Sequence, residues 1–491
     1  MILNRIDSNI EKKHLAIIAL LAAAFYMAIG LIDGPVIAAD SPSYISMDIT
    51  REPVYPLFLL MLRTIFGESI QLYGLPFYLT VAVILQSMLW TFAAYYVGRV
   101  VYKYGVIYSY VAAFFQIAVS CINRFIANRG SMYSETILTE SLAMPLYVIF
   151  CVVLWQWYED NAARRKSQAG KEDALTYIRN RFWNRYFITL LLLILVLISI
   201  RKQMLITVLM MLAMSFLHDI LFKKSRSIKS FFITMIAMVV VVTASNLMDC
   251  TYNYVHRGAW ITHTGNNKAA FCTLMYAANE SYAEYISDEG IRQLFLDMIA
   301  VCDEEGLLLK NTTADMNWLD ITEHYADSYD VIGYNIMMPM VDEYVAENYS
   351  ADYPESVVIS DEVQGVIIDA LIKHPSIGLV QVVFYNIVKG LVYSNCRATS
   401  LMMVAISFAL YLIYLAGLVV IYKYSRANDD KEYDIVLLAE IILMGILINS
   451  VSVGATIFPQ PRYMAYGMGL FFLVLFLEIF KYVKWKPLIR H

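Results

Sequence analysis

The chain has 491 residues, of which 59% are hydrophobic and 16% are charged, and its formal net charge is −5 at pH 7. Soluble domains carry about 25% charged residues, so this composition excludes an ordinary soluble protein. The sequence predicts an all-α polytopic membrane protein, for which we expect no nucleic-acid partner.

Apolar stretches of helical length recur along the chain. The first, 15–32, has no charge over 18 residues, enough to cross roughly 30 Å of hydrocarbon as a helix. It is longer than the apolar core of most signal peptides and no small-residue cleavage site follows it, so we expect it to be retained. Further stretches bring the prediction to about ten transmembrane helices: 74–98, 105–122, 141–158, 186–200, 203–217, 231–247, 399–422, 435–457 and 464–480.

The distribution of Lys and Arg predicts the orientation of these helices. Most of the Lys and Arg residues fall in the segment before the first helix, in short loops on the same side, and in the C-terminal tail, as expected of cytoplasmic segments. We therefore expect cytoplasmic N- and C-termini in the cytoplasmic (plasma) membrane. Arg201 and Lys202 separate the fifth and sixth stretches; one long helix would bury both cations at the bilayer centre, so a hairpin is favoured.

A long polar interruption at 248–376 predicts an extracytoplasmic domain, because it has 22 Asp and Glu residues against 5 Lys and Arg. Helical spacing of its apolar residues indicates a mostly helical structure, with Ser360 as the N-cap of one helix. The expected apolar faces are Ile291, Leu294, Met298 and Cys302 in one helix and Val363, Ile367 and Leu371 in another.

The chain thus divides into three parts. An N-terminal transmembrane module covers 1–247, the acidic domain covers 248–376, and a C-terminal module covers 377–491. The last begins with an apolar helix, Ile377 to Ser394, which we expect near the outer interface before the remaining transmembrane helices.

Cysteines and short motifs limit the possible chemistry. Cys250, Cys272, Cys302 and Cys396 fall outside in this topology, where disulfides are possible but no spacing demands them. No Walker, HExxH or GxSxG motif occurs, which removes support for ATP-driven and hydrolytic chemistry. No cofactor and no metal ligand is assigned, and dependence on a divalent metal stays open.

Polar residues gather in four turns on the extracytoplasmic side. Carboxylates beside arginines suit a reaction between a lipid-anchored phosphate and a hydroxyl, because the carboxylate can act as general base while the cations neutralise the phosphate. The residues are Asp40, Tyr44, Asp48, Arg51 and Tyr55 in the first loop, Arg124, Arg129, Glu135 and Glu140 in the second, Arg201 and Lys202 at the hairpin tip, and Arg462 and Tyr463 before the last helix.

Three short motifs stand in these turns. Asp40 and Tyr44 are followed by Arg51-Glu52-Pro53-Val54-Tyr55-Pro56, Thr139-Glu140-Ser141-Leu142 opens the fourth span, and Pro461-Arg462-Tyr463 precedes the last. In this order and on one side of the membrane they resemble the GT-C superfamily of glycosyltransferases that use polyprenyl-phosphate sugars. The branch most similar contains the protein O-mannosyltransferases and the aminoarabinose transferase of lipid A.

The resemblance implies a transferase that moves a sugar from a polyprenyl phosphate in the membrane lipid to a hydroxyl of a glycan, lipid or protein, with inversion. Asp40 would be the catalytic base and Glu140 would position the acceptor or Arg51. Many relatives carry two adjacent acids in the first loop, whereas Ser41 follows Asp40 here, so either one carboxylate suffices or Asp48 takes part. The implied substrate-binding residues are Tyr44, Arg51, Tyr55, Arg129, Arg201, Lys202, Arg462 and Tyr463.

Structural roles remain open for the same residues. His263, in a polar loop, is expected at the surface rather than in the site. The alternatives are an N-cap for Asp40, a first-turn acid for Glu140, headgroup contacts for Arg201 and Lys202, a boundary anchor for Arg462, and an ion pair with Glu52 or Asp48 for Arg51.

Two other function classes compete with a transferase. A transporter or flippase of lipid-linked glycans should have ionisable residues near the membrane midplane and repeated halves, and neither is visible in the sequence. A surface-polysaccharide polymerase would need to grip a glycan pyrophosphate, which the few basic residues of 248–376 disfavour. The sugar, the acceptor, the lipid length and the oligomeric state are not encoded in these patterns.

Overall fold

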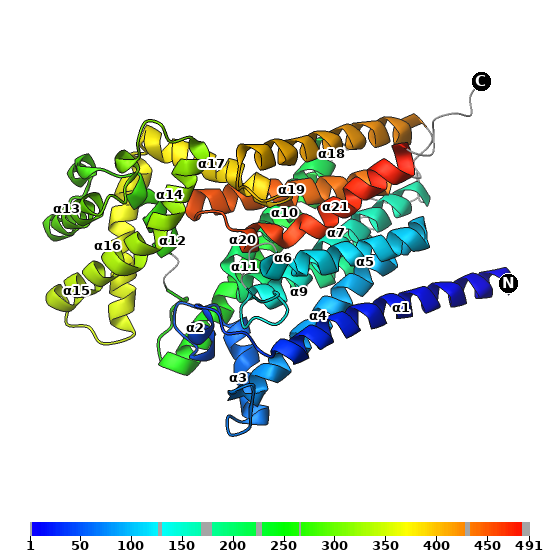
Figure 1. Cartoon of the computed structure of the whole chain (residues 1–491), viewed down its shortest axis with the longest axis horizontal. Helices are drawn as coiled ribbons and strands as arrows, with labels where there is room; N and C mark the ends of the chain where they lie inside the picture. Colours follow the sequence, from blue (N-terminus) through cyan, green and yellow to red (C-terminus); the bar gives the residue numbers. More distant parts are fainter. Residues whose placement is uncertain are drawn as a thin grey trace.

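The protein is an elongated bundle of helices with a smaller group of helices at one end (Figure 1). This computed structural model describes residues 2–125, 130–167, 179–221, 228–264, 267–427 and 433–483. The helices of the bundle are α1 (Ile2–Asp33), α4 (Phe77–Val101), α5 (Val106–Ser120), α7 (Glu140–Ser167), α9 (Arg185–Ile200), α10 (Ile206–Ser215), α11 (Ile228–Arg257), α18 (Leu401–Ala427), α19 (Tyr433–Thr456) and α21 (Met468–Leu477).

The expected all-α fold class is confirmed. In the described ranges the strands are β1 (Gln71–Leu72) and β2 (Leu75–Pro76), which form one antiparallel hairpin. A shorter helix, α3 (Val54–Phe66), precedes α4, and α2 (Ser41–Ile45), α6 (Ile122–Phe125) and α20 (Pro461–Met464) are single helical turns. Segments of 3₁₀ helix lie at Tyr102–Tyr104, Lys202–Leu205, Glu280–Tyr285, Leu309–Asn311 and Ala465–Gly467, and segments of π helix at Phe216–Leu221, Val331–Met337 and Glu478–Val483.

All ten apolar stretches predicted from the sequence are helical. Among the described residues, eight helices are long and apolar enough to cross a membrane, or nine if a bent pair counts as one span. Two predicted spans, α5 and α9, are shorter, with 15 and 16 residues. The length and composition of these helices are consistent with a multi-pass membrane protein.

The fifth and sixth stretches form the predicted hairpin rather than one long helix. Arg181 precedes α9, and Asp219 lies in the last turn after α10, yet their side chains pair through two bonds of 2.6 and 2.7 Å. The chain therefore returns to its starting end after the turn at Arg201. This pairing also satisfies two fully buried charges, because Arg181 is 1% and Asp219 0% exposed.

Breaking this buried pair is expected to destabilise the hairpin strongly. Asp219→Asn should lower the free energy of unfolding by about 3 kcal/mol, because it leaves a guanidinium buried without its counter-charge. A denaturant titration of the protein in detergent measures the loss in the free energy of unfolding. Lys373→Gln is the control, since its ion pair with Asp369 is exposed on both sides and should contribute at most about 1 kcal/mol.

The second group of helices, which we call the acidic helical domain, extends beyond the bundle (Figure 1). Its helices are α12 (Asn267–Tyr276), α13 (Glu289–Glu304), α14 (Trp318–Asp330), α15 (Met338–Asn348) and α16 (Glu355–Lys373). The predicted apolar faces of α13 and α16 are confirmed, because all seven residues named for them are buried in one core. This core is separate from the main core of the bundle.

One helix start was predicted wrongly. α16 begins at Glu355, so Ser360 lies inside the helix and its hydroxyl donates to Asp342 Oδ1 over 2.9 Å instead of capping. The sequence signal was misleading because Ser-Asp-Glu has the composition of a first turn. The helix ends at Lys373, with His374 as its C-cap.

Helix α17 (Ile377–Tyr393) joins the acidic helical domain to the bundle and bends by 96° from α16. It packs closely on α19, because a Cβ at Gly454 would meet the backbone nitrogen of Ile387 at 2.7 Å. The polar residues that interrupt this helix face inward: Asn386 is fully buried, and Lys389 pairs with Glu323 of α14 over 2.7 Å. These contacts fix the domain against the bundle.

The six cysteines all lie in described residues and remain thiols. The disulfides left open for Cys250, Cys272, Cys302 and Cys396 do not form in this structure. Cys272 and Cys302 are buried in the core of the acidic helical domain, where they pack as small apolar groups.

Candidate functional site

The carboxylate of Asp40 lies between two arginines. Arg51 Nη2 donates to Asp40 Oδ1 over 3.0 Å, and Arg462 Nη1 donates to Asp40 Oδ2 over 3.3 Å. Asp40 occupies the N-cap position of α2, but its side chain makes no capping bond. Asp40 therefore stands at the N-cap position, but its carboxylate does not cap the helix and pairs with the two arginines instead.

Glu140 forms the second carboxylate of the site. It opens α7 and is 1% exposed, and its Oε1 pairs with Arg201 Nη1 over 2.6 Å. Arg462 Nε lies 3.9 Å from the same oxygen. Arg462 therefore bridges the two carboxylates, and the turns predicted to meet do meet here.

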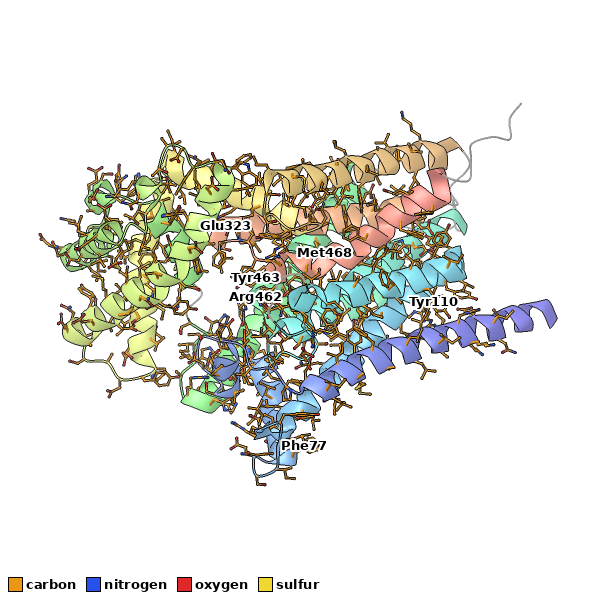
Figure 2. All side chains as sticks on the ribbon, in the orientation of Figure 1. Phe77, Tyr110, Glu323, Arg462, Tyr463 and Met468 are labelled. Carbon is orange, nitrogen blue, oxygen red and sulfur yellow. The ribbon has the colours of Figure 1, made fainter. Side chains whose placement is uncertain are left out.

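Tyrosine rings support the arginines on both sides. Arg51 stacks over the ring of Tyr44 at 4.6 Å and donates to its hydroxyl over 3.3 Å. Arg201 stacks over the ring of Tyr463 at 4.8 Å, and Arg462 donates to the Tyr463 hydroxyl over 2.8 Å. Figure 2 places Arg462 and Tyr463 where the bundle meets the acidic helical domain. The rings hold the planar guanidinium groups in position.

The site has an excess of positive charge. Three guanidinium groups, those of Arg51, Arg201 and Arg462, share two carboxylates. Burial on its own would raise the pKa of Asp40, but the charges of Arg462 and Arg51 outweigh it and hold that pKa below its usual value. Asp40 is therefore ionised at neutral pH, and one cation remains to bind an anion.

The acidic helical domain adds a cation that the sequence patterns did not identify. Lys268 of α12 stands over the ring of Tyr334 and is near enough to Asp40 and Arg51 for their charges to act on it. Burial lowers the pKa of Lys268 to about 8, and the charge of Arg51 acts in the same direction. The available signal was that Lys268 is one of only five basic residues between 248 and 376.

Two residues predicted to bind substrate have other contacts. Tyr55 is fully buried, packs edge to face on Tyr44, and donates to Gln86 Oε1 over 3.1 Å. The ammonium group of Lys202 donates to Asn246 Oδ1 over 3.2 Å and lies 3.9 Å from Asp249. None of these bonds involves Asp40, so Tyr55 and Lys202 flank the cluster at Asp40 rather than belong to it.

His263 was predicted at the surface, and this is wrong. It is 3% exposed and its Nδ1 is hydrogen-bonded to Asp249, with Glu52 Oε1 at 4.0 Å from its other ring nitrogen. Glu52 also accepts the backbone N–H of Lys202 over 2.6 Å. Glu52 is thus engaged away from Arg51, which pairs with Asp40 instead.

The contacts of Glu52 with Lys202 and His263 help to position the arginines of the site. Glu52 follows Arg51, and Lys202 follows Arg201, so the Glu52–Lys202 bond fixes the spacing of the two segments that carry the arginines. Asp48, the other acid considered for the first loop, accepts the backbone N–H and the hydroxyl of Thr50. These bonds give Asp48 a role in the turn.

Arg129 lies outside the described residues. In the rest of the chain, across the ranges that the structure describes, no group of three or more His, Cys, Asp or Glu side chains is arranged to hold a metal ion.

Comparison with protein-family models, with curated proteins and with solved structures found no match to this chain.

Proposed function

We propose that this protein is a membrane glycosyltransferase of the GT-C type, which moves a sugar from a polyprenyl-phosphate donor to an acceptor hydroxyl on the extracytoplasmic face, with inversion. The observation that carries the proposal is the arrangement of Asp40 between Arg51 and Arg462, beside the Glu140–Arg201 pair. It combines an ionised carboxylate with more cations than the carboxylates neutralise.

Asp40 is suited to act as general base. Its carboxylate is 29% exposed, so an acceptor hydroxyl can reach it, and two guanidinium groups hold its orientation. As the hydroxyl oxygen bonds to the anomeric carbon, its proton passes to Asp40. The bond from that carbon to the phosphate oxygen breaks, and polyprenyl phosphate leaves.

The arginines are suited to hold the leaving phosphate. One guanidinium group can donate two parallel hydrogen bonds to two oxygens of a phosphate. Its positive charge also stabilises the negative charge that develops on the phosphate as the bond to the sugar breaks. Arg201 stands at the end of the apolar helix α9, and Arg462 at the start of the last apolar helix. A polyprenyl chain can therefore stay among apolar helices while its phosphate reaches both cations.

The test is a transfer assay on the full chain in lipid nanodiscs. Polyprenyl-phosphate donors carrying different radiolabelled hexoses and pentoses are supplied with native membrane extract as acceptor. We expect label to leave one donor and appear in the acceptor fraction. Translocation of lipid-linked glycan with no transfer from any donor would contradict the proposal and favour a transporter.

Lys268 gives the proposed reaction a pH dependence. Its ammonium group is charged below its pKa of about 8 and neutral above it, so donor binding should weaken as the pH rises through 8. The expected rise in KM for the donor is about tenfold, because one hydrogen bond to a charged group contributes roughly 1.5–3 kcal/mol. Initial rates measured from about pH 6 to about pH 10, which is about two pH units on each side of the pKa, follow the titration from the charged to the neutral form.

Two variants of Lys268 separate its charge from its packing. Lys268→Arg stays charged throughout, so its KM for the donor should lose the dependence on pH. Lys268→Met should have the high KM at every pH. An unchanged pH profile in Lys268→Met would show that another group causes it.

A further inference from the structure

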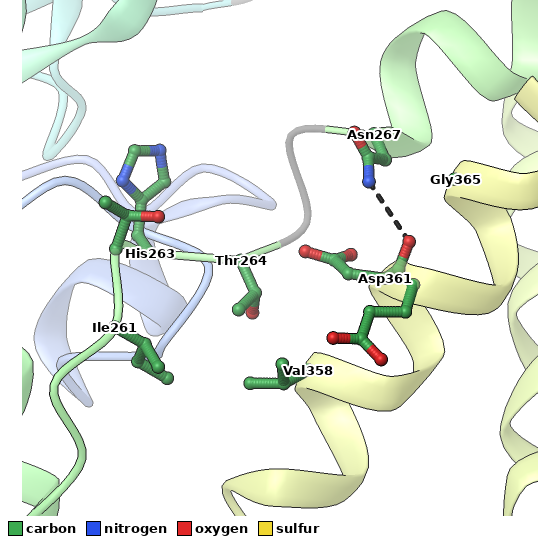
Figure 3. Close-up of a pocket in the computed structure, with 9 residues that line it drawn as sticks. Ile261, His263, Thr264, Asn267, Val358, Asp361 and Gly365 are labelled. Carbon is green, nitrogen blue, oxygen red and sulfur yellow. Dashed lines mark hydrogen bonds between the residues drawn. The ribbon is translucent and has the colours of Figure 1, made fainter. Parts of the chain in front are cut away.

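A cavity of about 510 Å³ lies between the loop that follows α11 and the helix α16 (Figure 3). Ile261 and Thr264 line it on the loop side, and Val358, Glu362 and Gly365 line it on the helix side. The volume is enough for a ligand the size of a small oligosaccharide segment. None of these residues belongs to the cluster around Asp40.

A residue that lines the cavity has a buried hydroxyl without a hydrogen-bond partner. Thr264 is 6% exposed, and its Oγ1 is buried without a hydrogen-bond partner. Figure 3 shows its side chain projecting toward the space in front of α16. A buried hydroxyl without a partner costs free energy, which a ligand bearing hydroxyl groups would offset.

The other lining groups define the class of ligand. Asp361 and Glu362 contribute carboxylates, which accept hydrogen bonds from hydroxyls and repel phosphate or other anions. Asn267 already donates to the backbone oxygen of Asp361 over 3.2 Å, and its side-chain oxygen is a further acceptor. Ile261 and Val358 offer apolar contact for C–H groups. Together they suit an uncharged, polyhydroxylated molecule.

The cavity is connected to the candidate active site through the backbone. The N–H of Thr264 donates to the carbonyl of Ile49 over 3.1 Å, which ties the lining loop to the loop that carries Asp40 and Arg51. Asn267 is followed by Lys268, whose charge interacts with Asp40. The loop that lines the cavity and the loop that carries Asp40 and Arg51 are therefore held together.

We propose that this cavity binds the carbohydrate of a neutral glycan acceptor, through Thr264, Glu362 and Asp361. This inference rests on the proposed transferase function, because it assigns the acceptor to a class. It separates the two substrates in space, with the anionic donor at the arginines and the uncharged acceptor at the carboxylates.

Gly365 provides the sharpest test. A Cβ at this position would meet nothing within 4 Å, so a larger side chain extends into open space. Gly365→Leu should obstruct the cavity, while leucine also favours the helix more than glycine does, so the variant should fold. Gly365→Ala is the matched control, because it improves the helix in the same way and leaves most of the cavity open.

Binding is measured directly on the full chain in nanodiscs, by saturation-transfer NMR with maltotriose and with chitotriose. Wild type and Gly365→Ala should bind at least one of these neutral oligosaccharides. Gly365→Leu should bind about tenfold more weakly, and so should Thr264→Val, which removes the unpaired hydroxyl without changing the shape. Absence of binding to wild type, binding unchanged in Gly365→Leu, or binding of spermidine or a Ser-rich peptide in place of the sugars would overturn the proposal.

This measurement requires no donor and no turnover. Failure of the transferase proposal would appear as wild-type protein that moves no sugar from any donor, whatever the oligosaccharides do. Failure of the acceptor site would appear as binding that ignores Gly365. The two proposals therefore fail in different experiments.

Discussion

Replacing Asp40 with Asn is expected to slow sugar transfer by about 10²–10⁴-fold, the range usual for removal of a general base. Asn matches Asp in size, and its single amide oxygen can replace only one of the two carboxylate oxygens that accept from Arg51 over 3.0 Å and from Arg462 over 3.3 Å. It cannot take the proton of the acceptor hydroxyl. The loss should therefore appear in kcat, measured as the initial rate at saturating donor and acceptor.

Donor binding should respond in the opposite direction. The site already holds three guanidinium groups against two carboxylates, and Asp40→Asn removes one negative charge. A phosphate should then bind at least as tightly as in the wild type, so the KM for the donor should stay the same or fall. A rise in the donor KM with unchanged kcat would assign Asp40 to holding the arginines instead of to proton transfer.

Asp48→Asn is the matched control in the same loop. Its carboxylate accepts two bonds from Thr50, and an amide oxygen can accept the same bonds. We expect transfer within about threefold of wild type, a difference of less than 1 kcal/mol. A loss as large as that of Asp40→Asn would mean that the two acids of the first loop act together.

The sequence was sufficient to predict the helices and the turns that meet in the site. Helical identity follows from apolar stretches whose length and lack of charge are read directly, which is why all ten were located. The return of the chain after Arg201 was predictable for a similar reason, since two adjacent cations are costly within a bilayer. The convergence of Asp40, Glu140 and Arg462 required one further assumption, that all these turns lie on the same side.

Pairing within the cluster was not predictable. Arg51 has Asp48 and Glu52 as near neighbours in sequence, but it pairs with Asp40, because Thr50 and Lys202 engage the other two acids. Such exchanges depend on three-dimensional contacts that spacing does not encode. The burial of His263 was missed for the same reason, since a polar loop can be covered by segments distant in sequence.

Replacing Arg201 with Gln is expected to destabilise the protein by about 3–5 kcal/mol, because it leaves a buried carboxylate without its principal counter-charge. Glu140 is 1% exposed, and Arg201 is its nearest cation, at 2.6 Å. Arg462 Nε, at 3.9 Å, compensates only in part. The free energy of unfolding in nanodisc-compatible detergent, measured by denaturant titration, gives the loss.

The double variant Glu140→Gln/Arg201→Gln separates stability from substrate binding. Two neutral amides can hydrogen-bond to each other, so the double variant should regain most of the stability that Arg201→Gln loses. The KM for the donor should not recover. If Arg201 holds the phosphate, its removal raises the donor KM by a similar factor in the wild-type and Glu140→Gln backgrounds.

The comparison of the single and double variants can also contradict a role for Arg201 in holding the phosphate. Should donor KM recover together with stability in the double variant, Arg201 would serve only to neutralise Glu140, and the phosphate would be held by the other cations of the site, Arg51, Arg462 and Lys268. We expect the effects of the Glu140 and Arg201 substitutions on the free energy of unfolding to be strongly coupled, and their effects on the KM for the donor to be nearly independent. It would mean that one guanidinium stabilises a buried acid through Nη1, 2.6 Å from Glu140, while the rest of its charge remains available to the substrate.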